Sequence, residues 1–321
     1  MRKSKTPKYP KQKLTGAQIR GRMKRYRWFY LMAVPAVVCA ILFHYYPMIG
    51  IRFAFTNYNG IKEPAFVGLE NFKKMFGTKD FLNAFRNTVE ISFLSLIFQI
   101  SFAVIISILL NEISNLHLKK VAQTIIYLPH FLSWVVTASI FTLILSPTPR
   151  GLINNFLVNI GAINSDQMIF FLGKNSTWRP VYYVIKLWKE TGWQTVLFMA
   201  TLAGVNVELY EAAAIDGAGR WGKMRYVTFP ALTNTILTVF ILNLARILNL
   251  FESVFVLQND AVLQTSNVIE TYVYYRTFNS GGIPNYGYTT AVGLFKSLVG
   301  VVLVLVCNQW SKKVRDGRGI V

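Results

Sequence analysis

The stretch Glu211–Met224 reads EAAAIDGAGRWGKM, and its second half comes within one residue of the phosphate-binding pattern G-x-x-x-x-G-K-[ST]. Gly217, Gly222 and Lys223 have the required spacing. Met224 stands where the pattern needs a hydroxyl, and a thioether is a poor ligand for Mg²⁺, which prefers oxygen. The residues before Gly217 are helix formers rather than a buried strand, so the sequence argues against nucleotide binding by this chain.

The same stretch predicts a short, bent helical element. Leu209–Ile215 is rich in alanine and should form a helix, which Gly217 and Gly219 then break or bend. Phe229-Pro230 opens the next helical segment, where proline is tolerated in the first turn. A bent helix between two apolar segments suits docking into a groove of another protein, and an ordinary connector is the alternative. Three alanines flanked by carboxylates, followed by a glycine break, favour docking.

The composition of the whole chain is that of a membrane protein. Its 321 residues are 53% hydrophobic and only 15% charged, whereas an average soluble domain has roughly 25% charged residues. Six apolar segments are long enough to cross a bilayer, which takes roughly 20 residues. The fold class that we expect is therefore an all-α, multi-pass integral membrane protein with six transmembrane helices. Their approximate bounds are Trp28–Ile49, Val89–Leu110, Val121–Leu145, Val181–Val205, Ala231–Val254 and Thr289–Gln309.

The distribution of Lys and Arg predicts the orientation. Residues 1–27 hold eleven Lys or Arg residues and no acidic residue. The C-terminus and the connections on the same side of the membrane are also basic, whereas the longer connections on the other side are less so, which predicts both termini in the cytoplasm. A nucleic-acid-binding arm is disfavoured for residues 1–27, because they run directly into an apolar segment. No A-x-A cleavage site follows that segment, so we expect an uncleaved first helix.

No cluster of residues indicates an enzyme or a metal site. The cysteines, Cys39 and Cys307, lie far apart in apolar runs, and the histidines, His44, His117 and His130, are isolated from one another. Zinc-site spacings and catalytic motifs such as G-x-S-x-G are missing. We therefore expect no catalytic residue, no metal and no cofactor bound by this chain. A stand-alone secondary transporter or channel for a polar solute is the alternative to a transport subunit, but no inverted repeat is evident.

Spacing around the bent element resembles that of a known family. The sequence is similar to the pattern E-A-A-x3-G-x9-I-x-L-P. It has Glu211-Ala212-Ala213, then Gly217 after three residues, then Val227-Thr228-Phe229-Pro230 after nine more. That pattern is the EAA loop of the binding-protein-dependent ABC importer permeases, here with conservative Val and Phe replacements. Asp216-Gly217-Ala218 extends the match in the manner of the family's sugar-importing members. Other segments also resemble the family: Asn71-Phe72, Asn87-Thr88 and Tyr127-Leu128-Pro129.

Within this family the sequence resembles the LplB/YteP-type permeases of Gram-positive bacteria, which are linked to complex oligosaccharides. This resemblance implies a transport subunit with the type I ABC importer permease fold in the plasma membrane. The implied partners are a homologous second permease, two copies of a cytoplasmic ABC ATPase carrying ATP and Mg²⁺, an extracellular solute-binding protein and membrane lipid, but no nucleic acid. It also implies that the EAA loop sits in a cleft of the ATPase, and the expected coupling residues are Glu211, Ala212, Ala213, Asp216, Gly217 and Arg220.

The expected division of the chain has four parts. Residues 1–27 form a basic cytoplasmic tail, and residues 28–85 form the first transmembrane helix and an extracellular loop. Residues 86–310 form the five-helix permease core with the coupling loop 208–230, and residues 311–321 form a basic cytoplasmic C-terminus. The extracellular connections 50–86, 146–180 and 255–287 are long enough to contact a protein partner.

Polar side chains in the last three apolar segments are candidates for the solute path, because charges inside a span are costly and usually face a cavity or a partner. Those of the fourth segment fall on one helical face about 140° wide, where Lys186 and Glu190 could pair at i, i+4. Those of the fifth segment spread over half a helix. The candidates are Lys186, Lys189, Glu190, Trp193, Gln194, Asn243, Arg246, Asn249, Glu252 and Lys296.

These side chains are expected to form a polar, aromatic path in which Trp193 stacks on a sugar ring and the others bond hydroxyl groups. Interhelical polar pairs and snorkelling lysines are the structural alternatives, equally favoured for Lys186 and Lys189. For Arg246 and Lys296 the transport role is favoured. Four buried or half-buried cations add the hypothesis that the oligosaccharide carries uronate carboxylates.

Overall fold

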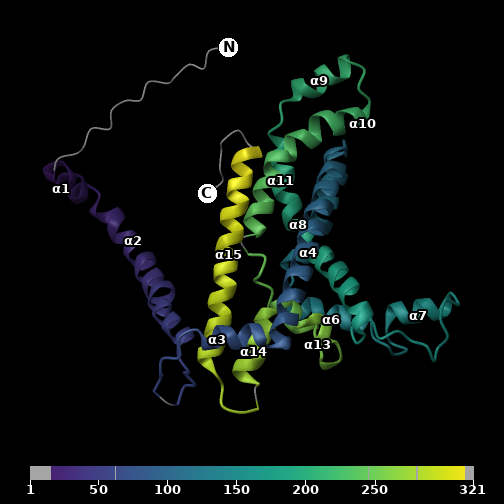
Figure 1. Cartoon of the computed structure of the whole chain (residues 1–321). Helices are drawn as coiled ribbons and strands as arrows, with labels where there is room; N and C mark the ends of the chain where they lie inside the picture. The colour runs from purple at the N-terminus through teal and green to yellow at the C-terminus, as the bar shows by residue number, and fades with distance from the viewer. Residues whose placement is uncertain (1–15, 62, 245, 280, 315–321) are drawn as a thin grey trace. The chain divides into compact units, whose positions relative to one another are not determined.

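The computed structural model describes residues 16–61, 63–244, 246–279 and 281–314, and these residues are almost entirely helical (Figure 1). Among them, Thr56 and Phe66 form an isolated antiparallel bridge, and no strand is present. The prediction of an all-α fold is therefore confirmed. Much of the expected basic tail, residues 1–15, and the C-terminal residues 315–321 lie outside the described residues.

The chain divides into two compact units, residues 1–52 and 53–321. The first contains α1 (Gly16–Arg25) and α2 (Arg27–Ala40). A π-helical turn η1 (Ile41–Tyr45) continues α2 into the 3-10 helix η2 (Tyr46–Phe55). Arg27–Phe55 as a whole is long and apolar enough to cross a membrane, so the first predicted span is present.

The second unit contains long helices joined by short ones (Figure 1). Its long helices are α4 (Lys79–Asn111), α8 (Asn175–Ala203), α11 (Phe229–Leu244) and α15 (Tyr286–Val314). The short ones are α3 (Glu70–Gly77), α5 (Leu116–Tyr127), η3 (Leu128–Phe131), α6 (Trp134–Ile144), α7 (Leu152–Asn159), α9 (Val207–Ile215), α10 (Arg220–Lys223), η4 (Met224–Thr228), α12 (Glu252–Leu257), η5 (Asp260–Val262), α13 (Leu263–Ser266) and α14 (Ile269–Phe278). Figure 1 shows α9 and α10 at one end of the long helices, the α9 end, and α3, α13 and α14 at the other, the α14 end.

The six predicted spans are present if each bent helix pair counts as one span. By length and composition, four helical segments of the described chain can cross a membrane: Arg27–Phe55, Lys79–Asn111, Arg220–Leu244 and Tyr286–Gln309. Two bent pairs raise the number to six: Leu116–Phe131 with Trp134–Ile144, bent by 102°, and Asn175–Ala203 with Val207–Ile215, bent by 71°.

The third predicted span, Val121–Leu145, is bent rather than straight. Pro129 in η3 has no N–H to donate to a helical hydrogen bond, so the helix does not continue through it. The chain restarts at Ser133, whose Oγ accepts a hydrogen bond of 3.2 Å from the Val136 N–H at the start of α6. The bend therefore has a local cause in the sequence.

The fifth predicted span, Ala231–Val254, is also not a single helix. It ends with α11 at Leu244, and residues 246–251 form turns and irregular backbone before α12 begins at Glu252. Arg246 and Asn249 therefore lie in an irregular segment. The prediction of one continuous helix, with its polar groups spread over half of the helix surface, was therefore wrong for this span.

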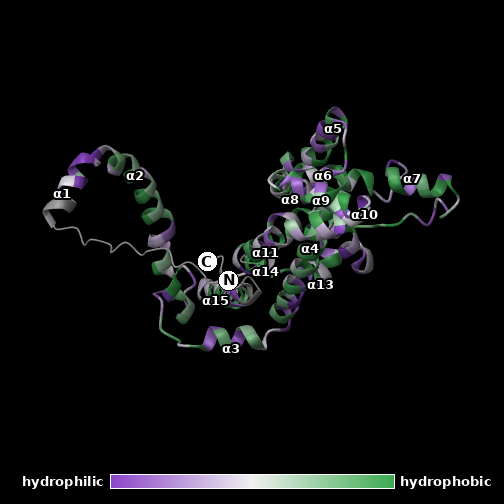
Figure 2. Ribbon diagram, turned by 90° about the horizontal axis from the view of Figure 1, so that it is seen from above, coloured by the Kyte–Doolittle hydropathy of each residue, from purple (hydrophilic) through white to green (hydrophobic). Residues whose placement is uncertain are grey.

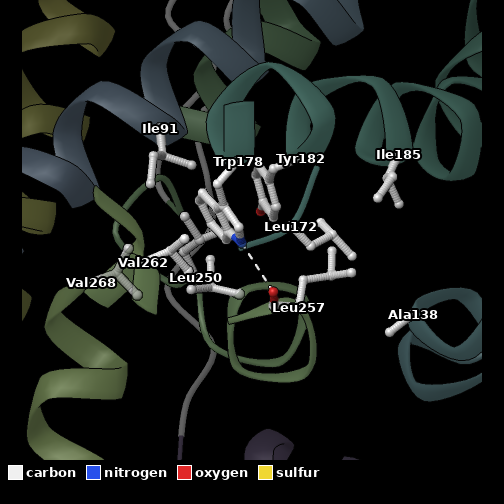
Figure 3. Packing of buried hydrophobic residues seen from close by; sticks show 11 residues of the cluster. Ile91, Ala138, Leu172, Trp178, Tyr182, Ile185, Leu250, Leu257, Val262 and Val268 are labelled. Carbon is white, nitrogen blue, oxygen red and sulfur yellow. Dashed lines mark hydrogen bonds between the residues drawn. The ribbon is translucent and has the colours of Figure 1, made fainter. Parts of the chain in front are cut away.

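The centre of the second unit is the packing of α4 along α8. Figure 2 shows many hydrophobic residues among the helices of this unit, and large apolar side chains such as Phe93 and Ile105 of α4 remain exposed, as expected of a lipid-facing surface. Trp178, fully buried, stacks on Tyr182 with ring centroids 5.1 Å apart. Its indole N–H donates to the Leu257 carbonyl at 3.0 Å, which fixes the start of α8 against α12 (Figure 3).

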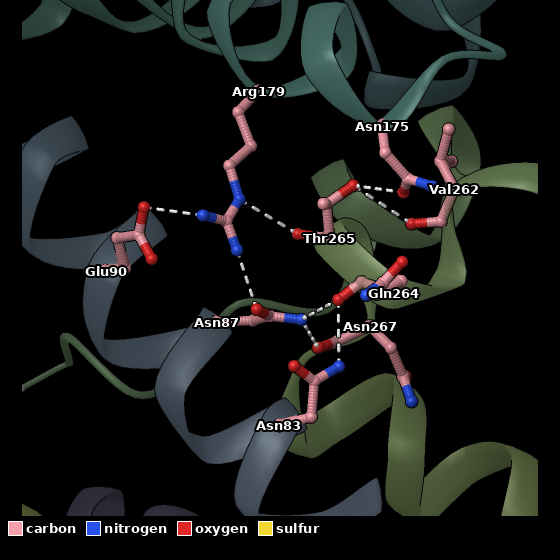
Figure 4. A network of polar contacts seen from close by, with 9 residues as sticks. All are labelled: Asn83, Asn87, Glu90, Asn175, Arg179, Val262, Gln264, Thr265 and Asn267. Carbon is pink, nitrogen blue, oxygen red and sulfur yellow. Dashed lines mark hydrogen bonds and ion pairs between the residues drawn. The ribbon is translucent and has the colours of Figure 1, made fainter.

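At the α14 end, a network of hydrogen bonds and one ion pair connects α4, α8 and the segment around α13 (Figure 4). The Arg179 guanidinium forms an ion pair with Glu90 and donates to Asn87 Oδ1 at 2.6 Å and to the Thr265 carbonyl at 3.1 Å. The Asn87 amide in turn donates to the carbonyls of Gln264 and Asn267, at 3.1 and 2.9 Å. One arginine and one asparagine thus hold α4, α8 and the α13 segment together.

Candidate functional site

A pocket of about 280 Å³ lies near the middle of α4 and α8, closed on another side by the last turns of α11 and the irregular segment after it. We call it the central pocket. Seven of the ten candidate path residues line it: Lys186, Glu190, Trp193, Gln194, Asn243, Arg246 and Asn249. Its other lining residues are Ser92, Leu96, Gln99, Leu197, Val239, Ile247 and Leu250.

Helical period places these side chains together. The lining residues of α8 recur at intervals of three and four, from Lys186 to Leu197, and so share one face of the helix. Ser92, Leu96 and Gln99 follow the same period on α4. Ser92 and Gln99 were absent from the sequence candidates, although polar residues at that spacing in an apolar helix carry the signal that identified the α8 set.

The charges of the central pocket do not pair as expected. Lys186 and Glu190 form no ion pair; Glu190 instead lies 3.6 Å from His130 Nδ1 and 4.0 Å from Lys189 Nζ. The Lys186 ammonium lies over the Tyr182 ring, 5.7 Å from its centroid. Among the described residues, neither Lys186 nor Arg246 has a carboxylate within 4.0 Å. The pocket therefore presents two cations that could accept a solute carboxylate.

Two buried polar atoms belong to the same lining. In the described part of the chain, Ser92 Oγ and Gln194 Oε1 are buried without a hydrogen-bond partner. Buried polar atoms are normally hydrogen-bonded, so these suit a solute hydroxyl or water. Trp193 stacks on the His130 ring, with centroids 5.1 Å apart, yet stays 52% exposed. Its free surface is the kind on which a sugar ring packs.

Three candidate residues lie outside the central pocket. The Lys189 side chain is buried; its ammonium donates to the His130 carbonyl at 3.1 Å and lies over the Trp134 ring, as the structural alternative implies. Lys296 of α15 donates to Glu270 of α14 at 2.6 Å and to Asn249 Oδ1 at 3.0 Å, so it touches the lining only through Asn249. Glu252 is exposed at the start of α12.

The second candidate region is the coupling element at the α9 end. The predicted bent helix is present: α9 begins after Asn206, whose side chain accepts from the Glu208 N–H. It ends at Ile215, and Gly217, two residues later, has φ +79°. The Gly217 N–H donates to the Ala214 carbonyl and the Ala218 N–H to the Ala213 carbonyl, at 3.1 and 2.8 Å. This is a Schellman motif with glycine at its left-handed position.

The coupling element has an exposed surface. Of the six coupling residues, Ala213 is half-buried, and Glu211, Ala212, Asp216, Gly217 and Arg220 are exposed. Ile215 and Trp221, which the sequence prediction left out, are 87% and 83% exposed, a large apolar area beside them. Tyr210 and Thr228 hydroxyls, 3.1 Å apart, connect α9 to η4 and thus to α11. Docking on this surface would therefore act on a long helix.

The chain is similar to known membrane transport proteins. Residues 99–316 match the family model described as binding-protein-dependent transport system inner membrane component. Protein LplB of Bacillus subtilis (strain 168) is 38% identical over 295 residues, which cover 91% of this chain and 90% of LplB. The polygalacturonan/rhamnogalacturonan transport system permease protein YteP of the same organism is 36% identical over 291 residues, covering 89% of this chain and 88% of YteP.

A solved transporter structure is similar to this chain over nearly its whole length. The crystal structure of a bacterial ABC transporter involved in the import of the acidic polysaccharide alginate matches with a TM-score of 0.84 and 32% identity, covering 92% of this chain and 99% of that chain. The resemblance inferred from the EAA spacing is therefore confirmed. The chain is a membrane-spanning permease subunit rather than an enzyme, and it belongs to the family of binding-protein-dependent transport system inner membrane components.

Proposed function

We propose that this chain is one permease subunit of an ATP-driven oligosaccharide importer in the plasma membrane of a Gram-positive bacterium. In this proposal the α9 end, residues 1–27 and residues 311–321 face the cytoplasm, and the α14 end faces outward. The observation that carries the proposal is the central pocket, where amides, a hydroxyl, an indole and two cations without carboxylate partners line one cavity beside three long helices.

The proposed solute is an anionic oligosaccharide, one that carries uronate groups. Lys186 and Arg246 supply the charge complement, and charge-assisted hydrogen bonds to carboxylates are about twice as strong as neutral ones. One solved relative takes part in the import of an acidic polysaccharide, and the name of another specifies polygalacturonan. Gln99, Gln194 and Asn243 would bond the hydroxyl groups that every such sugar carries.

The proposed assembly has a second permease, two cytoplasmic ATPases and an extracellular solute-binding protein. A solved alginate transporter is in complex with an alginate pentasaccharide-bound periplasmic protein, which supports the last of these. Trp193 and Arg246 are exposed, and in this proposal a second permease covers them and completes the path. ATP and Mg²⁺ would be held by the ATPases, and Glu211, Ala212, Ala213, Asp216, Gly217 and Arg220 would contact them.

Removing both cations of the central pocket should lower the uptake of acidic solutes more than that of neutral ones. We expect the double variant Lys186→Gln, Arg246→Gln to lower trigalacturonate uptake at least about tenfold, since each charge-assisted bond contributes about 1.5–3 kcal/mol and about 1.4 kcal/mol corresponds to tenfold. Uptake of neutral galactotriose should stay within about twofold. The measurement is ATP-dependent uptake of each labelled sugar by the complete transporter in proteoliposomes.

The matched control is Lys120→Gln, which removes an exposed cation of α5 that does not line the central pocket and should leave both rates unchanged. An equal loss for both sugars in the double variant would rule out carboxylate recognition. Uptake that needs no ATPase subunit would favour the alternative, a stand-alone secondary transporter or channel. If wild type transports neither sugar, the substrate proposal fails.

A further inference from the structure

A second polar cavity lies at the α14 end, apart from the central pocket. Two adjoining pockets of about 530 and 250 Å³ share Tyr272 and Arg276 and run along α14; we call them the α14 groove. Together they have the size of a site for a small ligand. No candidate path residue lines either pocket, so the groove is a feature that the proposed path does not use.

The floor of the α14 groove is fixed by the network of Figure 4. The Asn83 amide donates to the Gln264 carbonyl at 2.8 Å, and the buried Asn87 amide donates to the same carbonyl and to that of Asn267. These bonds hold the backbone of residues 264–267 against α4. A site held in this way is preorganised, which reduces the ordering needed when a ligand binds.

The walls of the groove offer groups that bond sugars. Gln264, Tyr275 and Asn279 line it, and none of their side chains makes a hydrogen bond to another described residue. Side-chain amides and a phenol hydroxyl supply both donors and acceptors for vicinal hydroxyls. The Tyr275 ring adds an apolar face on which a pyranose can pack.

The groove is also electropositive. Its charged lining residues are Lys74, Arg276 and Asp80; Arg276 lies 3.0 Å from Asp80, and both side chains of that pair are largely exposed. Burial raises the pKa of Tyr272, and the hydrogen bond with Tyr288 adds to this, so Tyr272 is a neutral hydroxyl at physiological pH. Two cations therefore face a single carboxylate.

We infer that the α14 groove is an entry subsite, which takes a short stretch of an anionic oligosaccharide before that sugar reaches the central pocket. The inference rests on the proposed function, oligosaccharide import with the α14 end outward. Lys74 and Arg276 contact sugar carboxylates, and Gln264, Tyr275 and Asn279 contact hydroxyls. A loop of the solute-binding protein is the competing occupant, and its binding is separated from sugar binding in the test.

The test measures binding and uptake separately. The complete transporter is placed in nanodiscs without solute-binding protein, and trigalacturonate binding is measured by calorimetry for wild type and for Gln264→Ala, Tyr275→Ala. Neither side chain bonds another described residue, so the fold is expected to survive, which thermal unfolding checks. The variant should bind trigalacturonate at least about tenfold more weakly at one of two sites, while Gln167→Ala, an exposed glutamine of the connection between α7 and α8, leaves both sites unchanged.

The outcomes are distinguishable. Unchanged trigalacturonate affinity in the groove variant overturns the entry subsite, whether or not Lys186→Gln, Arg246→Gln lowers uptake. Weaker capture of the solute-binding protein, with sugar binding intact, overturns it too and assigns the groove to that protein. Failure of wild type to transport trigalacturonate and galactotriose would instead refute the proposed function.

Discussion

Replacing Gly217 with valine is expected to lower ATP-dependent uptake at least about 100-fold. Gly217 has φ +79°, a conformation that a β-branched residue adopts only with strain. Relief of that strain would break the Schellman hydrogen bonds that end α9, and α10 would leave α9 in another direction. The proposed contact with the ATPase would then lose its shape. Uptake by proteoliposomes and co-purification of the ATPase with the permease measure the effect.

Gly219 provides the matched control two residues away. It has φ −67°, and nothing lies within 4 Å of an added Cβ, so Gly219→Val keeps an ordinary backbone and should retain most uptake. Glu211→Lys, which reverses an exposed charge without strain, should also uncouple uptake from ATP hydrolysis. Normal uptake in Gly217→Val and Glu211→Lys would refute the coupling role, and equal losses in Gly217→Val and Gly219→Val would show that the glycine conformation is irrelevant.

Replacing Asn87 with leucine is expected to lower the stability of the folded chain by about 3–5 kcal/mol. Asn87 is 1% exposed, and its amide serves two main-chain carbonyls and the Arg179 guanidinium. Leucine has a similar volume but satisfies none of them, and each buried group left unpaired costs about 1–3 kcal/mol. The midpoint of thermal unfolding of the purified transporter in detergent should fall by roughly 10 °C.

Asn83, one turn earlier on α4, is the control for this substitution. It makes one hydrogen bond, to the Gln264 carbonyl, which Asn87 also serves, and its side chain is only half-buried. Asn83→Leu should therefore lower the midpoint by no more than a few degrees. Similar shifts for the two variants would contradict the central role of Asn87.

The coupling element was predictable because its causes are local. An alanine-rich run favours a helix, and Gly217 permits the left-handed conformation just past its end, so residues close together in the sequence determine the bend. The central pocket was predictable in part, since the period of α8 places Lys186, Glu190 and Gln194 on one face whatever lies opposite.

What the sequence did not predict depends on contacts between distant segments. Residues 231–251 are predominantly apolar and contain neither proline nor glycine, so no local breaker indicated that the helix ends at Leu244. Arg179 looked like a cation of an extracellular connection, but its partner Glu90 lies 89 residues earlier. Lys189 shares its helix with the pocket residues, yet its ammonium is held by the His130 carbonyl, 59 residues away.

The two unpaired cations of the central pocket also have an electrical consequence. Moving one elementary charge across 100 mV involves about 2.3 kcal/mol, so a trisaccharide with three carboxylates enters a negative cell against about 7 kcal/mol. Lys186 and Arg246 are fixed charges and cannot change that total, which ATP hydrolysis must supply. They can lower the barrier inside the membrane, where an unneutralised anion is unstable. For the proposed anionic solute, membrane voltage therefore opposes import, and depolarising the membrane should accelerate it.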